Sequence, residues 1–270
     1  MISRPSPLVS VLMTAYNREK YIAEAIESVL ASIYTNFELI IVDDCSTDDT
    51  VKIANEYGSK DERIRVYVNE RNIGDYNNRN KAASYAVGKY IVYLDSDDLM
   101  YDFSLLHSVR YMEMFPEAGF GVYSKSDIKK PYPVCINPRQ IYEEHYFGEF
   151  GHFSRSPGSA IIKLDVFKSL NGFSGKRFVG DMEFWMKIAR FHKMVKHCVP
   201  TFWYRNENSD KESKYEKNTS QLRKNISIEA LMHPDCPLTK KDALRAIKNI
   251  NRNKYQVFFR KVVNKIKIFL

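Results

Sequence analysis

Cysteine is scarce in this chain of 270 residues, which contains only four cysteines, at positions 45, 135, 198 and 236. No two of them form a Cys-x-x-Cys pair, which argues against a zinc ribbon and excludes a redox motif of that type. An isolated cysteine usually packs as a small core residue in a reducing compartment. The cysteine content therefore favours a cytoplasmic protein.

Long apolar runs and glycine-rich phosphate loops are also missing. No stretch of about 18 apolar residues occurs, so we expect no membrane-spanning helix. The polar residues 1–7, with two prolines, do not have the pattern of a secretory signal. The first apolar run is not followed by Gly-x-Gly-x-x-Gly, and Gly-Lys-Ser/Thr is absent. These absences disfavour a dinucleotide dehydrogenase, a P-loop nucleotide hydrolase and a nucleotidyltransferase that opens with a glycine-rich loop.

Charge is distributed unevenly along the chain. The whole sequence carries a net charge of +8, and residues 238–270 contain ten basic residues and one acid. That C-terminal segment is therefore +9, and residues 1–237 sum to −1. Its apolar residues recur at spacings of three, four and seven, which predicts an amphipathic helix. Such a helix can dock on the protein or lie on an anionic membrane surface. Both alternatives stay open, and nucleic-acid binding is disfavoured because it leaves the clustered acids of the body unexplained.

The first hundred residues alternate between apolar runs and helical patterns. We expect strands at residues 8–15, 37–42, 63–68 and 90–94, and helices at 20–32, 47–57 and 77–87. This alternation predicts one Rossmann-like, mostly parallel sheet flanked by helices. Beyond residue 98 we expect helices at 104–115, 181–192 and 220–233, strands at 119–124 and 160–164, and one or two strands within 194–204. Residues 129–157 are expected to form a loop region.

The sequence Asp95-Ser96-Asp97-Asp98 follows the fourth expected strand. Three carboxylates so close together repel one another unless a positive group binds them. Oxygen ligands suit Mg²⁺ or Mn²⁺, which proteins often share with substrate phosphates. A turn whose acids cap the next helix is the alternative. The position at the carboxyl end of a strand favours a site, because ligands of such sheets gather at that edge.

Other polar residues also occur at strand ends or helix starts. Thr14 and Tyr16 follow the first strand, and Asp44 follows the second, where it can cap a helix or accept hydrogen bonds from a base or ribose. Arg79 can pair with a diphosphate or with a neighbouring acid. Asp181 begins an expected helix, where it is either a cap or a general base.

Five motifs occur in the order typical of one family: VSVLMTAYN, IIVDDCSTDDT, NIGDYNNRNKA, GKYIVYLDSDD and GDMEFWMKIA. Together they resemble the family 2 glycosyltransferases, inverting enzymes with the GT-A fold, over about residues 8–205. The resemblance implies a GT-A domain at residues 1–237, with a nucleotide-binding half at about 8–100 and an acceptor half at about 101–237. Residues 238–270 are then a C-terminal, helical basic appendage.

The resemblance also implies roles for particular residues. Thr14, Tyr16 and Asp44 match positions that hold the nucleotide base and ribose. Arg79 matches a basic position near the nucleotide, and Asp97 is implied to lie by the ribose.

Metal binding and catalysis are implied in the same way. Asp98 or Asp95 would hold Mg²⁺ or Mn²⁺ on the diphosphate of the donor, and Asp181 matches the general base. Gly180 departs from the glutamate that is frequent before that aspartate, and Asn206-Glu207-Asn208 lacks the histidine of some members.

The implied reaction is transfer of a sugar from a nucleotide-sugar, with UDP-sugars as the favoured donors, to a hydroxyl of a saccharide or lipid-linked acceptor. Hexosyl or N-acetylhexosaminyl transfer in cell-surface polysaccharide or glycan assembly fits this class. The basic segment allows peripheral contact with the inner face of the membrane, with docking on the body as the other alternative. We expect no nucleic-acid partner, because such a partner leaves the clustered acids unexplained. The alternative is a non-catalytic protein of the same fold that binds a nucleotide-sugar.

Overall fold

The computed structural model describes residues 6–124, 133–148, 151–205 and 209–252. Its main sheet has eight strands in the order β3-β2-β1-β4-β8-β6-β9-β7. These strands are β1 (Val9–Ala15), β2 (Phe37–Asp43), β3 (Ile64–Val68), β4 (Tyr90–Asp95), β6 (Ala118–Tyr123), β7 (Val134–Ile136), β8 (Ala160–Lys163) and β9 (Lys193–His197). A small second sheet pairs β5 (Leu99–Met100) with β10 (Phe202–Trp203).

Strand direction determines where the strands end. β1 is parallel to β2 and β4, β2 is parallel to β3, and β6 is parallel to β9. β8 is antiparallel to both β4 and β6, so β4 and β6 run in the same direction. Strands β1, β2, β4, β6 and β9 therefore all end at one edge of the sheet, which we call the carboxyl edge. The expected single, mostly parallel sheet is confirmed.

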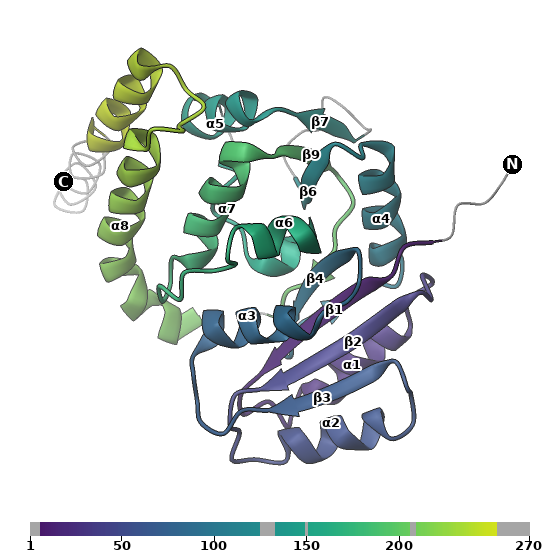
Figure 1. Ribbon diagram of the computed structural model, residues 1–270. Helices are drawn as coiled ribbons and strands as arrows, with labels where there is room; N and C mark the ends of the chain where they lie inside the picture. The colour runs from purple at the N-terminus through teal and green to yellow at the C-terminus, as the bar shows by residue number, and fades with distance from the viewer. Residues whose placement is uncertain (1–5, 125–132, 149–150, 206–208, 253–270) are drawn as a thin grey trace, which may run out of the picture.

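Helices cover both faces of this sheet, as Figure 1 shows. They are α1 (Ile22–Leu30), α2 (Thr50–Gly58), α3 (Asp75–Tyr85), α4 (Ser104–Met114), α5 (Pro138–Phe147), α6 (Leu164–Ser169), α7 (Gly180–Phe191) and α8 (Ser209–Met232). Successive side chains of a strand point to opposite faces. Accordingly, Val11 and Met13 pack in a core with α1 and α4, whereas Leu12 packs in a second core with α3, α5, α7 and α8.

The expected loop at residues 129–157 is wrong for most of its described part. Residues 134–136 form β7, and residues 138–147 form α5. The helix begins with a reciprocal cap: the Asn137 side chain accepts from the Gln140 amide at 2.9 Å, and the Gln140 side chain accepts from the Asn137 amide at 3.0 Å. Pro138 is the first helical residue, a position where its missing N–H costs nothing. The proline content therefore marked a helix start rather than a loop.

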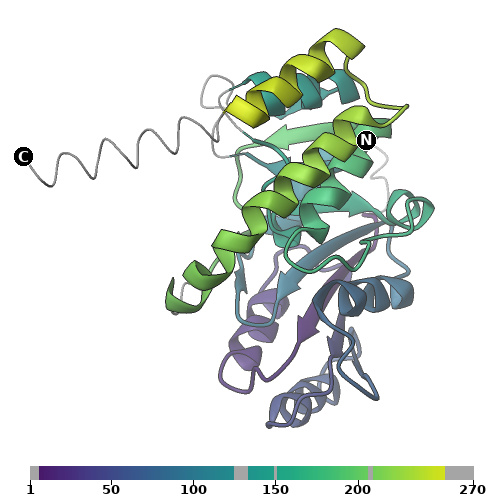
Figure 2. The same cartoon turned by 90° about the vertical axis from the view of Figure 1, so that its left-hand side faces the viewer.

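Residues 240–252 are helical and pack against the body of the protein. Leu238, Ala243 and Ala246 are buried in the same core as α5, α7 and α8. The guanidinium of Arg245 lies 4.8 Å from the centre of the Phe147 ring of α5. Figures 1 and 2 show this helix at the end of the molecule opposite α2. The apolar positions expected from residue 257 onward lie outside the described residues.

Membrane-spanning segments can be sought only within the described part of the chain. There, no helix combines the length and the apolar character that crossing a bilayer requires.

Candidate active site

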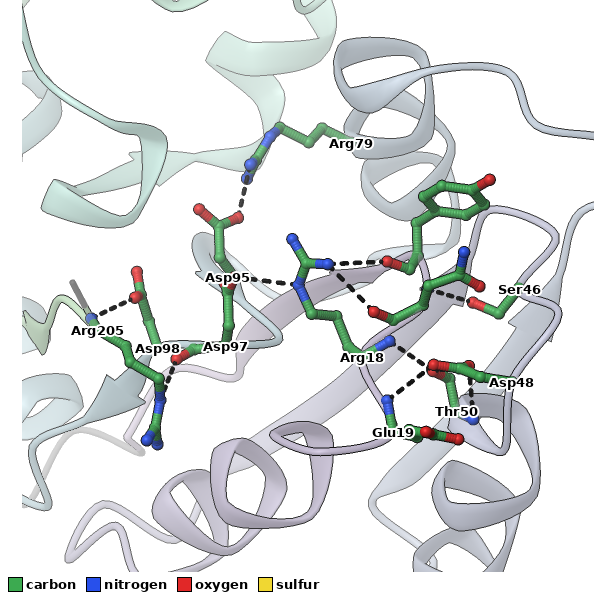
Figure 3. Close-up of polar contacts among 12 residues, drawn as sticks. Arg18, Glu19, Ser46, Asp48, Thr50, Arg79, Asp95, Asp97, Asp98 and Arg205 are labelled. Atoms are coloured by element: carbon green, nitrogen blue, oxygen red, sulfur yellow. Dashed lines mark hydrogen bonds and ion pairs between the residues drawn. The ribbon is translucent and has the colours of Figure 1, made fainter. Parts of the chain in front are cut away.

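Polar residues meet at the carboxyl edge where β1 lies between β2 and β4. The register pairs Thr14 of β1 with Val42 on one side and Asp95 on the other. The backbone amide of Asp44 donates to the Ala15 carbonyl at 2.8 Å, which holds the end of β2 beside the end of β1. The polar residues that follow β1, β2 and β4 are far apart in the sequence and thus lie close together, as expected from the strand order (Figure 3).

The turn at residues 95–98 follows β4 directly. The Asp98 amide donates to the Asp95 carbonyl at 3.0 Å and closes the turn. The side chains of Asp95 and Asp97 are 34% and 35% exposed, whereas Asp98 as a residue is only 2% exposed. One carboxylate of the turn is therefore buried, while the other two are partly exposed.

Asp98 is held in an environment that opposes its negative charge. Burial raises the pKa of Asp98 to about 7, and the neighbouring charges of Asp95 and Asp97 raise it further, while the hydrogen bond from the Arg205 amide lowers it. That amide donates to Oδ1 of Asp98 at 3.0 Å. Such a carboxyl is ready to bind a positive group in place of its proton.

Arg79 of α3 supplies a buried positive charge beside the turn. Its Nε donates to Asp75 at 2.8 Å, and its Nη2 donates to Asp95 at 2.6 Å. Its Nη1 is buried without a hydrogen-bond partner. The two carboxylates raise the pKa of Arg79 against the opposing effect of its burial. The third arm of the guanidinium therefore remains free for another acceptor.

Two further arginines contact the same turn, and our interpretation of the sequence assigned neither of them. Nε of Arg18 pairs with Asp97 at 3.0 Å. Nε of Arg205 donates to the Asp97 carbonyl at 2.9 Å, and its Nη2 pairs with Glu24. Figure 3 shows these arginines and Arg79 around the turn. Arg18 follows the end of β1 by three residues, so its place at a strand end was the available signal. Nothing local marked Arg205.

Asp44 is buried, and both of its carboxylate oxygens accept hydrogen bonds from the segment that leads into α3. Oδ1 accepts from the Asn69 side chain and the Ile73 amide, each at 2.8 Å, and Oδ2 accepts from the Gly74 amide at 2.9 Å. Both oxygens of the Asp44 carboxylate are therefore already engaged by the loop. Of the two residues expected beside Asp44, Tyr16 is 46% exposed, and Thr14 is half-buried at the end of β1.

Asp181 lies in the first turn of α7, where Oδ1 accepts from the Met182 amide at 2.7 Å. Burial raises the pKa of Asp181, while the Met182 amide, a hydrogen bond from Tyr76, and the charges of Arg223 and Arg79 lower it. Arg79 therefore interacts with Asp181 as well as with Asp95. Arg79 of α3 thus pairs directly with the 95–98 turn and acts on the α7 carboxylate through its charge.

Gly180 explains how α7 approaches α3 so closely. A Cβ atom at this position would lie 2.8 Å from the ring of Tyr76. The glutamate that is frequent at this position in the family would not fit without movement of that ring. The absence of a side chain here brings Asp181 and Tyr76 together.

The carboxylate oxygens of the turn are the kind of ligand that a hard divalent cation prefers. Within the described residues, no group of three or more His, Cys, Asp or Glu side chains forms a metal site. Asp95 and Asp98 offer oxygen ligands, and a hard cation takes its other ligands from phosphate and water. The segment Asn206-Glu207-Asn208 lies outside the described residues.

Comparison with known proteins gives consistent results. The model of the family described as glycosyl transferase family 2 matches residues 10–170, which is more than half of the chain. An uncharacterized glycosyltransferase of Methanocaldococcus jannaschii, MJ1057, is 34% identical over 211 residues, which cover 72% of this chain and 71% of that protein. TuaG of Bacillus subtilis, named for teichuronic acid biosynthesis, is 49% identical over 92 residues, only 34% of this chain and 36% of that protein.

Solved structures share the fold at low sequence identity. TarS of S. aureus, residues 1–349 in complex with UDP-GlcNAc, has a TM-score of 0.69 at 22% identity, covering 90% of this chain and 71% of that one. The mannosyltransferase PcManGT of Pyrobaculum calidifontis, in complex with GDP-Man and Mn²⁺, has a TM-score of 0.66 at 18% identity, covering 91% of this chain and 69% of that one.

Proposed function

Since this chain belongs to glycosyl transferase family 2 and has the GT-A fold, we propose that it transfers a sugar from a nucleotide-sugar to an acceptor hydroxyl with inversion. The observation that carries the proposal is the arrangement at the carboxyl edge, where Asp95 pairs with Arg79, Asp98 lies in the same turn as Asp95, and the charge of Arg79 acts on Asp181. The turn follows β4 and Asp181 begins α7, so acids from two distant parts of the chain lie within reach of the charge of one guanidinium.

Asp181 acts as the general base in this proposal. The acceptor oxygen forms a bond to the anomeric carbon as the bond from that carbon to the diphosphate oxygen breaks, and the hydroxyl proton passes to the Asp181 carboxylate. The nucleoside diphosphate leaves with the electron pair. The hydrogen bond from Tyr76 and the nearby charge of Arg79 favour the ionised form of Asp181 that this step needs.

The donor is proposed to be a UDP-sugar, which gives a hexosyl or N-acetylhexosaminyl transferase. The UDP-GlcNAc complex of TarS, a protein of the same fold, supports this choice. Thr14, Tyr16 and Asp44 are proposed to contact the base and ribose, and Asp97 to lie by the ribose. The Nη1 of Arg79, which has no hydrogen-bond partner, is proposed to interact with the diphosphate.

Asp95 and Asp98 are the residues that would hold Mg²⁺ or Mn²⁺. Such a cation would stabilise the charge that develops on the departing diphosphate. The Mn²⁺ complex of PcManGT, another protein of this fold, supports the choice of metal. The raised pKa of Asp98 adds support, because a bound cation offsets the cost of ionising that buried carboxyl.

The acceptor is proposed to be a saccharide or a lipid-linked saccharide of cell-surface polysaccharide assembly. The name of TuaG, which refers to teichuronic acid biosynthesis, supports this class. In this proposal, residues 8–100 bind the nucleotide and residues 101–237 form the acceptor half.

The direct test is a donor screen that measures release of UDP, GDP and TDP from their sugars with Mn²⁺ and candidate acceptors. We expect acceptor-dependent release of UDP that chelation of the metal removes. Tight binding of a nucleotide-sugar with no release under any acceptor would favour the alternative, a non-catalytic binding protein of the same fold.

We also propose that the protein works at the cytoplasmic face of a membrane, in contact through the basic segment that begins at residue 238. Five basic residues of the helix at residues 240–252 are exposed, and Leu244 of the same helix is 52% exposed. These residues are Lys240, Lys241, Arg245, Lys248 and Arg252. Basic side chains with an apolar neighbour suit a surface of anionic lipids.

Flotation with vesicles of phosphatidylglycerol or phosphatidylcholine tests this contact. The triple change of Lys241, Lys248 and Arg252 to glutamate should abolish binding to the anionic vesicles. The matched control reverses three exposed basic residues near the opposite end of the molecule, Lys52, Lys60 and Arg71. Equal flotation of the two variants would remove the membrane proposal.

A further inference from the structure

The ends of β6 and β9 form a second part of the carboxyl edge, on the acceptor side of β4. β6 ends at Tyr123 and β9 ends at His197, and the register pairs these two residues. The segment that precedes β8 crosses this part of the edge and brings Arg155 to the end of β6. There, Nη1 of Arg155 donates to the Tyr123 carbonyl, and Nη2 donates to the Ser124 hydroxyl at 3.4 Å.

The guanidinium of Arg155 has no acidic partner among the described residues. A guanidinium carries five N–H groups. Arg155 uses two of them for its bonds to residues 123 and 124, and the other three have no hydrogen-bond partner among the described residues. Nε is buried without a hydrogen-bond partner. Burial lowers the pKa of Arg155, and the only opposing charge effect comes from Tyr123 rather than from an acid.

Other arginines near this edge are neutralised. Arg79 pairs with two carboxylates, and Arg18 and Arg205 each pair with one. An ionised group that is withdrawn from water without a counter-charge costs free energy. A negatively charged ligand at Arg155 would offset that cost.

Helix α7 connects Arg155 to the proposed general base. The indole N–H of Trp185 donates to the Arg155 carbonyl at 2.8 Å. Trp185 follows Asp181 by four residues on the same helix, so the two side chains lie on one face, one turn apart. The backbone of Arg155 is therefore tied to the helix that carries the proposed general base.

We propose that Arg155 binds an anionic group, a phosphate or a carboxylate, on the acceptor. This inference rests on the proposed function and narrows the acceptor to a negatively charged saccharide. The guanidinium fork matches both groups in a two-point contact. Arg155 is then a specificity-determining residue of the acceptor half, distinct from the residues proposed to bind the donor.

The test compares three sugars that differ only at C6: methyl β-glucoside, methyl β-glucuronide and methyl β-glucoside 6-phosphate. Their binding is measured by calorimetry on the full chain, with UDP and Mn²⁺ at saturation so that the donor site cannot take the phosphate. Wild type should bind at least one anionic sugar on the order of tenfold more tightly than the neutral one. Which of the two is preferred distinguishes a phosphate-bearing acceptor from a uronic acid.

Three variants assign the preference to Arg155. Arg155→Gln should reduce the ratio of anionic to neutral affinity to about one, and Arg155→Lys should retain part of it. The matched control is Arg190→Gln, because Arg190 of α7 also has a buried, unpartnered Nε but lines a pocket between α7 and α8. It should keep the wild-type ratio, and affinity for UDP should be unchanged in all three variants.

Equal affinity of wild type for the three sugars, or undetectable binding of both anionic ones, overturns the proposal. An unchanged ratio in folded Arg155→Gln also overturns it. If that variant does not fold, the wild type and Arg155→Lys decide. Sugar binding is measured without turnover, so the two experiments fail independently. A negative donor screen would count against the proposed function, and a negative binding experiment would count against the role of Arg155.

Discussion

At the scale of single residues, the 95–98 turn places three acids against three arginines, and the buried Asp98 is the one without a guanidinium on its carboxylate. Its pKa of about 7 lies well above the usual value near 4. Between these values, the folded protein holds a proton that the unfolded chain has lost. The free energy of unfolding should therefore fall as the pH rises from about 4 to about 7.

Urea denaturation of the metal-free protein at several pH values checks this expectation. Across this window, the free energy of unfolding of wild type should fall by an amount on the order of a few kcal/mol. The Asp98→Asn variant should not show this fall. Asp97→Asn is the matched control, because that side chain is 35% exposed and should leave most of the decline in place. Parallel pH profiles for wild type and Asp98→Asn would contradict the assignment.

Arg79 should contribute strongly to stability as well as to the site. Changing Arg79 to methionine leaves the carboxylates of Asp75 and Asp95, which are 54% and 34% exposed, without their buried partner, which should cost about 1–3 kcal/mol. The control Arg139→Met removes the pair with Glu143, whose side chains are 55% and 41% exposed, and should cost about 0–1 kcal/mol. Chemical denaturation measures both. A similar small loss in each variant would show that Arg79 is not the structural link described here.

Individual site residues could be predicted from the sequence only where a strand end or helix start marked them. Asp95 and Asp98 follow an apolar strand, and Asp181 begins a helical pattern, so their places in the fold could be predicted from the sequence. Arg18 had the same kind of signal, its place after β1, but its contact with the turn was not assigned. The contact of Arg205 could not be predicted, because it depends on how the segment after β10 folds back to the turn. Local sequence patterns also could not predict the hydrogen bonds that Asp44 accepts from the loop before α3.

At the scale of elements, the reciprocal cap at the start of α5 should hold that helix in place. Asn137→Ala removes one hydrogen bond of the cap and should cost about 1 kcal/mol. Asn249→Ala, at an exposed position within the helix at residues 240–252, is the control and should cause no loss. Thermal unfolding compares the two. An unchanged midpoint for Asn137→Ala would mean that tertiary packing alone positions α5.

Strands and helices of the first hundred residues were predictable because their periods differ clearly. β1 and β2 are apolar runs, and α1 buries Ile22, Ala25, Ile26 and Val29 at helical spacing. After residue 98 the pattern weakened. α6 was missed because it has only six residues, and α5 was missed because proline was interpreted as a loop signal.

At the scale of the whole molecule, the helix at residues 240–252 shares the core of α5, α7 and α8. Ala246 is fully buried there, so Ala246→Glu should destabilise the protein by several kcal/mol. Leu244→Glu changes a residue of the same helix that is 52% exposed, and should change stability by less than about 0.5 kcal/mol. Urea denaturation separates the two. Equal stability of both variants would mean that this helix is not part of the body.

Asp181 joins the two halves of the proposed reaction, because it belongs to the acceptor half and shares Arg79 with the turn proposed to bind the metal. Steady-state release of UDP by Asp181→Asn, with calorimetry of UDP and Mn²⁺ on the same sample, tests that role most directly. We expect turnover to fall on the order of 10²–10⁴-fold, with donor affinity within about threefold of wild type. Turnover at the wild-type rate would contradict the account.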